Sequence, residues 1–162
     1  MKNALHTMLG LTAALLFLTV AAQAQDKSAQ LAIITAPGAA LSDVSLPDVG
    51  RYFKAEKNKA PDGTKIVIVM MDVGRPERDA ALKGVYKMSE AEYNDYFVGA
   101  TFTGAVQAAP KALGSPAAMK KFVAETPGAI GYLRASDADD SVKVLKVDGK
   151  APGEAGYALA IK

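Results

Sequence analysis

Cysteine and tryptophan are absent from the 162-residue sequence, and histidine occurs only once, at His6. Without cysteine there is no disulfide framework, so an apolar core must hold the fold together. Zinc and copper sites favour imidazole and thiolate ligands, and Ser-His-Asp or Cys-His nucleophiles need the same side chains. Because the chain has no cysteine and no histidine other than His6, we predict a binding protein and not an enzyme, with no metal and no cofactor.

The N-terminus has the three parts of a secretory signal peptide. Lys2 supplies a positive charge, an uncharged run follows over 8–22, and Ala22-Gln23-Ala24 fits the small-x-small pattern of a cleavage site. The run is shorter than the roughly 20 residues that span a bilayer, which disfavours the alternative of an uncleaved anchor. We therefore predict a signal peptide over residues 1–24 and export to the periplasm. Cleavage would also remove His6.

Neither sign of charge is in large excess. The sequence holds 19 basic and 17 acidic side chains, and cleavage after Ala24 would remove Lys2, which leaves 18 basic ones. This near balance gives no electrostatic basis for binding nucleic acid or an anionic membrane. We therefore expect neither of them as a partner.

Hydrophobic patterning over residues 25–162 predicts a single α/β domain with a mixed sheet and flanking helices. The run 65–71 is its most apolar part, which is typical of a strand covered on both faces. Further strands are expected at 30–35, 129–133, 142–147 and 157–161, and helices after Ser45, from Pro76 to about Tyr86, after Ser89 and after Ser115. Glycines predict a break over 99–104, after the helix that begins at Ser89, and an interruption of the strand 129–133 at Gly131.

A series of short motifs covers residues 41–133. They are Leu41-Ser42, Leu46, Tyr52-Phe53, Pro61-Asp62-Gly63, the two arginines within 75–78, Tyr96-Phe97, Phe102-Thr103-Gly104 and the segment TPGAIGY at 126–132. In order and spacing they resemble the phosphate-binding proteins of bacterial ABC importers, and more closely the short, stand-alone members of that periplasmic-binding-protein-like family. The run PGAIGY is the most specific of these motifs.

The resemblance implies a single lobe of the type II periplasmic-binding fold, because the chain has about half the length of the two-lobed importer proteins. It also implies capture of a small anion such as phosphate outside the inner membrane, with an ABC permease as partner. In the importer proteins, an arginine and a Ser-Gly-Thr run at a helix start grip the phosphate. The matching stretch here is MDVGRPER at 71–78.

Gly74, Arg75 and Arg78 form the predicted anion site within that stretch. Backbone N–H groups at a helix N-terminus favour anions, and the two guanidinium groups add charged donors. Thr103 and Gly104 are further candidates, through a hydroxyl group and backbone donors. The alternatives are a structural turn at 102–104 and a surface helix whose arginines pair with nearby carboxylates, namely Asp72, Glu77 and Asp79.

Three functions follow from these patterns. The first is a periplasmic solute-binding-like protein that takes phosphate or another small oxyanion for an ABC importer. The second is an interaction module, a lobe that has lost its ligand and covers exposed apolar surface with a partner or as a homodimer. The third, a hydrolase acting through carboxylates, is disfavoured because no histidine or cysteine supports it.

Overall fold

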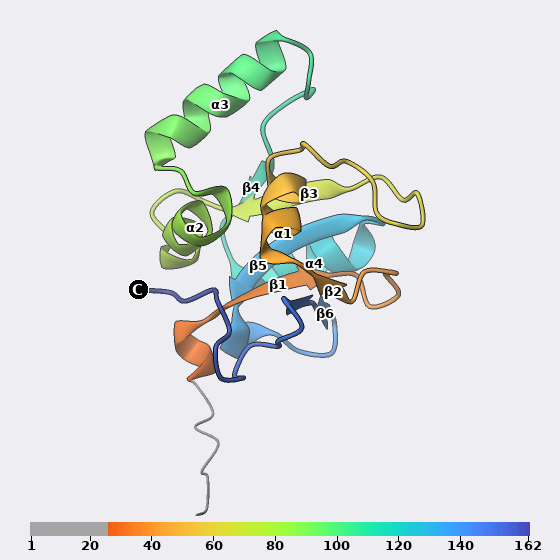
Figure 1. The fold of residues 1–162 in the computed structure, drawn as a ribbon, viewed down its shortest axis with the longest axis vertical. Coiled ribbons are helices and arrows are strands. Elements are labelled where there is room, and N and C mark those ends of the chain that lie inside the picture. Colours follow the sequence, from red (N-terminus) through yellow and green to blue (C-terminus); the bar gives the residue numbers. More distant parts are fainter. Residues whose placement is uncertain (1–25) are drawn as a thin grey trace, which may run out of the picture.

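A five-stranded mixed sheet lies at the centre of the protein in the computed structural model, which describes residues 26–162 (Figure 1). The strand order is β4-β3-β5-β1-β6, and the strands are β1 (Leu31–Thr35), β3 (Val67–Met71), β4 (Lys111–Leu113), β5 (Ala129–Arg134) and β6 (Lys143–Val144). β3 is parallel to β4 and β5, whereas β1 is antiparallel to β5 and β6. The predicted mixed α/β sheet is confirmed, while the predicted signal peptide lies outside the described residues.

Helices pack on both faces of this sheet. They are α1 (Leu46–Phe53), α2 (Pro76–Ala81), which continues as a π-helical turn over Leu82–Tyr86, α3 (Glu90–Phe102) and α4 (Pro116–Glu125). Successive residues of a strand face opposite sides. In β5, Gly131 therefore faces Met119 of α4, while the Tyr132 ring lies 6.0 Å from the Phe53 ring of α1. α3 extends away from the sheet as an arm (Figure 1).

Short elements complete the fold. β2 (Asp43–Val44) and β7 (Lys146–Val147) form a separate two-stranded parallel sheet. Two 3-10 helices lie at Lys27–Ala29 and Ala135–Asp137.

Three serine caps begin the longer helices, as the sequence predicts. Ser45 Oγ accepts from the Asp48 N–H at 3.3 Å, and Ser115 Oγ accepts from the Ala118 N–H at 3.1 Å. Ser89 forms a complete capping box with Glu92, whose carboxylate accepts from the Ser89 N–H at 2.7 Å. Each cap satisfies a backbone donor that the first helical turn leaves free.

Several boundary predictions are wrong. Gly131 does not interrupt β5 but lies within it, because α4 packs so closely that a Cβ atom there would lie 2.5 Å from Met119 Sδ. The helix after Ser89 continues through Gly99 to Phe102, so the predicted break over 99–104 begins only at its last residues. The segment 142–147 divides between two sheets as β6 and β7, and 157–161 contributes only the isolated bridge between Gln30 and Ala160.

An aromatic cluster joins α3 to the rest of the core. The Tyr86 ring contacts Phe53 and Tyr93 edge to face, with ring centroids 5.7 and 5.1 Å apart. The Tyr93 and Phe97 rings, whose centroids are 4.8 Å apart, meet at a tilt of 51°. Burial raises the pKa of Tyr93 to about 12, so its hydroxyl stays protonated at neutral pH. Of the α3 side chains, only Tyr93 and Phe97 are fully buried, which leaves most of the arm in contact with solvent.

Candidate functional site

The C-terminal ends of the parallel strands β3 and β4 lie side by side and carry the predicted anion segment. Met71 pairs with Leu113, and the next N–H group, that of Asp72, donates to the Leu113 carbonyl at 3.0 Å. α2 begins at Pro76 and α4 at Pro116, shortly after each strand. Two helix N-termini, where backbone N–H groups lack helical partners, therefore begin at this edge of the sheet. We call residues 72–76 and 114–116 the β3/β4 edge.

Gly74 and Arg75 form the turn into α2. Gly74 has a φ of +84°, a conformation that glycine adopts at little cost. Arg75 occupies the N-cap position and makes no side-chain capping hydrogen bond. Its Nε atom is buried and has no hydrogen-bond partner within residues 26–162. Because an unpaired buried donor is costly, this nitrogen would gain from an acceptor that a ligand brings.

Arg78 is a buried side chain that pairs within the protein. It is only 4% exposed, and its Nε and Nη2 donate to the two carboxylate oxygens of Glu90 at 2.8 and 2.7 Å. Its Nη1 donates to the Met71 carbonyl at 2.9 Å. These contacts join α2, the start of α3 and the end of β3, and the Arg78 guanidinium lowers the pKa of Glu90. All three nitrogens of the Arg78 guanidinium therefore already donate within the protein, and a direct contact with an anion stays a prediction.

Glu77 forms a second ion pair that the sequence analysis missed. Its side chain is 6% exposed, and its Oε1 accepts from Arg134 Nε at 3.0 Å. Arg134 Nη1 also donates to the Ser28 carbonyl, which ties the first described residues to α2. No sequence pattern indicates this pairing, since Glu77 and Arg134 are 57 positions apart. The pair neutralises a carboxylate next to Arg75 that would otherwise repel an anion.

The exposed part of the β3/β4 edge is small and carries both signs of charge. Asp72 is exposed, and one of its carboxylate oxygens lies 3.1 Å from the position of a Cβ atom on Gly114. Val73 is 70% exposed and fills none of the core. In the part of the chain that the structure describes, neither Arg75 nor Asp72 takes part in an ion pair. The predicted alternative, in which Arg75 pairs with a neighbouring carboxylate, is therefore not observed.

Thr103 and Gly104 lie apart from this edge. Gly104 lines a groove together with Phe53 at the end of α1 and Val67 at the start of β3, whereas Gly74 follows the other end of β3. The Thr103 hydroxyl lies 3.1 Å from the Gly99 carbonyl, to which it donates in the last turn of α3. The structure therefore brings Gly74 and Arg75 together but does not bring Thr103 and Gly104 to them.

A metal-ligand cluster and a membrane-spanning helix are both absent from residues 26–162. These residues contain no cluster of three or more carboxylate, imidazole or thiolate side chains that could hold a metal ion. Over the same range, no helix has both the length and the apolar character needed to cross a bilayer.

Three solved structures share this fold. A phosphate ABC transporter substrate-binding protein from Clostridium perfringens, solved with bound phosphate, matches with a TM-score of 0.63 and 23% identity over 76% of this chain. An ABC-type phosphate transport receptor from Vibrio cholerae matches with a TM-score of 0.61 and 15% identity, and PstS from Borrelia burgdorferi with 0.57 and 16%, each again over 76% of this chain. None of these three descriptions names an enzyme.

The chain spans about half of each of these proteins, namely 47%, 48% and 49% of their lengths. The fold is therefore that of a single lobe resembling the periplasmic-binding-protein fold, as predicted. No protein-family model matches the sequence, and no curated protein is similar to it.

Proposed function

We propose that this protein is an exported solute-binding-like protein that holds a small oxyanion at the β3/β4 edge, with Gly74 and Arg75 as its ligand-binding residues. The observation that carries the proposal is the buried Nε of Arg75, which lies beside the N-terminus of α2 and has no hydrogen-bond partner among residues 26–162. A guanidinium group and free backbone N–H groups are the donors that oxyanions prefer in proteins. The likeness to phosphate-binding proteins supports the same class of ligand.

The remaining arginine of the predicted site has a different role in this proposal. Arg78 holds α2 in place through Glu90 and Met71, so it would fix the direction of the helix N-terminus without touching the anion. Arg134 neutralises Glu77 in the same helix. Thr103 and Gly104 would contribute only to a separate contact, because they border another groove.

Export through a signal peptide at residues 1–24 would place the protein in the periplasm, where an ABC permease is the partner that the fold suggests. Transport itself requires more than an anion site. Because this chain matches only about half of each neighbour, delivery to a permease by this single lobe is part of the proposal.

Thermal melting with added anions tests the proposal. We expect sodium phosphate or sulfate at millimolar concentration to raise the melting temperature above that in sodium chloride of equal ionic strength, since a ligand at about 100 times its Kd adds about 2.7 kcal/mol. Arg75→Gln should abolish this rise, whereas Arg51→Gln, on the exposed side of α1, should retain it. Sulfate and phosphate also stabilise proteins non-specifically, so an equal rise in the wild type and Arg75→Gln would refute the proposal.

A second candidate function is an interaction module that works through α3. Val98 and Phe102 are one helical turn apart, and they are 70% and 93% exposed. Exposed apolar side chains that adjoin one another often mark an interface. If a second copy of the chain covers them, light scattering should show a dimer that Phe102→Ser dissociates. A monomer at all concentrations, in the wild type as in the variant, would argue against self-association.

A further inference from the structure

A separate cavity lies at the opposite end of the sheet from the β3/β4 edge. It has a volume of about 270 Å³ and is bordered by the loop after β1, the Pro-Asp-Gly turn before β3 and the turn between α4 and β5. Ile66 and Gly128, at its base, precede β3 and β5, whereas Arg75 follows the C-terminal end of β3. This volume has room for several water molecules, and therefore for a small organic molecule.

Apolar side chains and polar atoms contribute almost equally to the walls of this cavity. The apolar part includes the side chains of Ala36, Ala39, Ala40, Leu41, Ala60 and Ile66. Small-molecule sites are typically concave and apolar, with a few polar groups that fix the orientation of the ligand. The polar side chains of the cavity therefore decide which ligand it fits.

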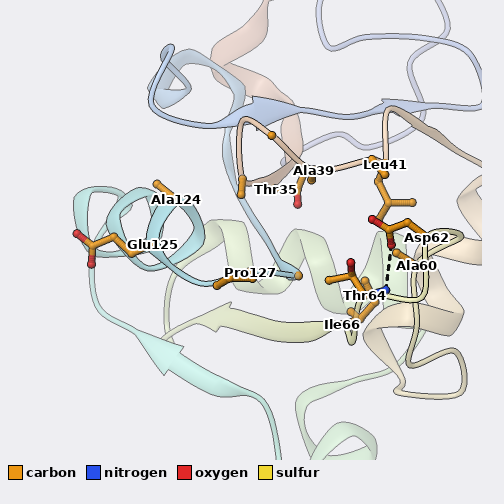
Figure 2. A pocket seen from close by; sticks show the side chains of 14 residues that line it. Thr35, Ala39, Leu41, Ala60, Asp62, Thr64, Ile66, Ala124, Glu125 and Pro127 are labelled. Carbon is orange, nitrogen blue, oxygen red and sulfur yellow. Dashed lines mark hydrogen bonds between the residues drawn. The ribbon is translucent and has the colours of Figure 1, made fainter.

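Two of those polar side chains, Thr35 and Asp62, offer acceptors. The Thr35 hydroxyl, which is 1% exposed, donates its only proton to the Ala129 carbonyl at 2.9 Å, so only its lone pairs remain for a ligand. Figure 2 shows Asp62 between Leu41 and Thr64 on one side of the cavity. Asp62 Oδ1 accepts from the Thr64 N–H at 2.9 Å, which lowers the pKa of this carboxyl group and keeps it ionised at neutral pH.

Among the described residues, no lysine or arginine lines the cavity. Glu125, the other charged residue of the lining, has its carboxylate turned away from the cavity in Figure 2. Lys143, outside the lining, donates to the Ala39 carbonyl at 2.9 Å and is held there. The charge that faces the cavity is therefore that of the Asp62 carboxylate.

We propose that this cavity binds a small organic ammonium ion with a compact apolar body. The ammonium group donates to the Asp62 carboxylate and the body contacts the alanine side chains. Asp62, together with the absence of lysine and arginine among the described lining residues, disfavours an anion in the cavity. This proposal is independent of the oxyanion site, because the two sites share no residue.

Three probes with the same ring test the proposal: benzylammonium, benzyl alcohol and benzoate. Each is titrated into the 15N-labelled protein, and backbone amide shifts are recorded. We expect benzylammonium to shift the amides of Gly38, Ala39, Thr64 and Gly128, benzyl alcohol to shift the same amides with lower affinity, and benzoate to leave them unchanged. Shifts by benzylammonium at other residues only, or equal shifts by benzoate at these residues, would overturn the proposal.

The variant Asp62→Asn separates charge from shape. The amide oxygen of asparagine can still accept from the Thr64 N–H, so the turn is retained while the charge is lost. Because the carboxylate is exposed to solvent, we expect affinity for benzylammonium to fall by up to about fivefold and that for benzyl alcohol to stay unchanged. Asp140→Asn, at an exposed position outside this cavity, is the matched control. Equal affinity for benzylammonium in the wild type and Asp62→Asn would overturn the role of Asp62.

Discussion

Arg78 and Arg75 lie in the same short segment, yet we assign Arg78 a structural role and Arg75 a ligand-binding role. The substitution Arg78→Met tests the role of Arg78. Methionine keeps much of the length and apolar surface of the side chain but removes all of its hydrogen bonds. The change breaks two bonds to Glu90 and one to the Met71 carbonyl, a group in the core of the sheet. It also removes the contact between the Arg78 guanidinium and the Tyr93 ring, which lie 4.9 Å apart.

The expected loss of stability depends on the two groups that lose Arg78 as a partner, the Glu90 carboxylate and the Met71 carbonyl. Removing one partner of a buried ion pair costs about 3–5 kcal/mol when the other charge stays buried. The Glu90 side chain is 34% exposed, so water can solvate the carboxylate that Arg78 leaves. The buried Met71 carbonyl, in contrast, loses a donor that water cannot replace easily. We therefore expect Arg78→Met to lower the free energy of unfolding by about 2–3 kcal/mol.

Urea unfolding at pH 7 measures this difference, with Arg75→Gln as the control. Arg75 has an unpaired buried donor and no ion pair within residues 26–162, so its replacement should not lower the free energy of unfolding. Hydrogen exchange should show faster opening of α3 in Arg78→Met, because the broken contacts attach its first turn. A loss below about 0.5 kcal/mol in Arg78→Met would refute the structural role.

Two further predictions concern packing and pH. Gly131→Ala should lower the free energy of unfolding by about 1–3 kcal/mol, because its Cβ atom would lie 2.5 Å from Met119 Sδ and 2.9 Å from Val69 Cγ2. Gly99→Ala, in open space on α3, should raise it by about 0.5–1 kcal/mol in the same unfolding assay. Since Arg78 lowers the pKa of Glu90 from 4.5, the stability that this pair adds should be complete above pH 4.5 and lost as the pH falls through the folded-state pKa. The difference in unfolding free energy between wild type and Glu90→Gln should therefore shrink on acidification, and a constant difference would contradict this linkage.

Local signals explain why much of the fold could be predicted. Ser45, Ser89 and Ser115 act through backbone groups three residues away, and the uniformly apolar run before Met71 indicates a strand buried on both faces. The failures involve contacts between distant segments. Gly131 was predicted to interrupt a strand, but α4 requires a residue without a side chain at that position.

The site was predicted only where its determinants are local. The turn at Gly74 and the N-cap position of Arg75 follow from a glycine before Arg75 and a proline after it. The pairs Arg78–Glu90 and Glu77–Arg134 depend on how α2 packs against α3 and β5, so the sequence alone could not assign them. Composition also gives no sign of the cavity beside Asp62, which three separate loops enclose.

Asp72 offers the sharpest test of the electrostatics at the β3/β4 edge. Arg134 neutralises Glu77, whereas Asp72 and, one helical turn from Arg75, Asp79 take part in no ion pair among the described residues. Asp72 is exposed, so its repulsion of a bound oxyanion should be worth about 0.2–1 kcal/mol, the range of surface charge pairs. Asp72→Asn should therefore tighten phosphate binding by up to about fivefold and enlarge the rise in melting temperature, while Asp95→Asn on the exposed side of α3 should leave both unchanged. If Asp72→Asn weakens binding instead, the Asp72 carboxylate accepts a hydrogen bond from the ligand and is part of the site.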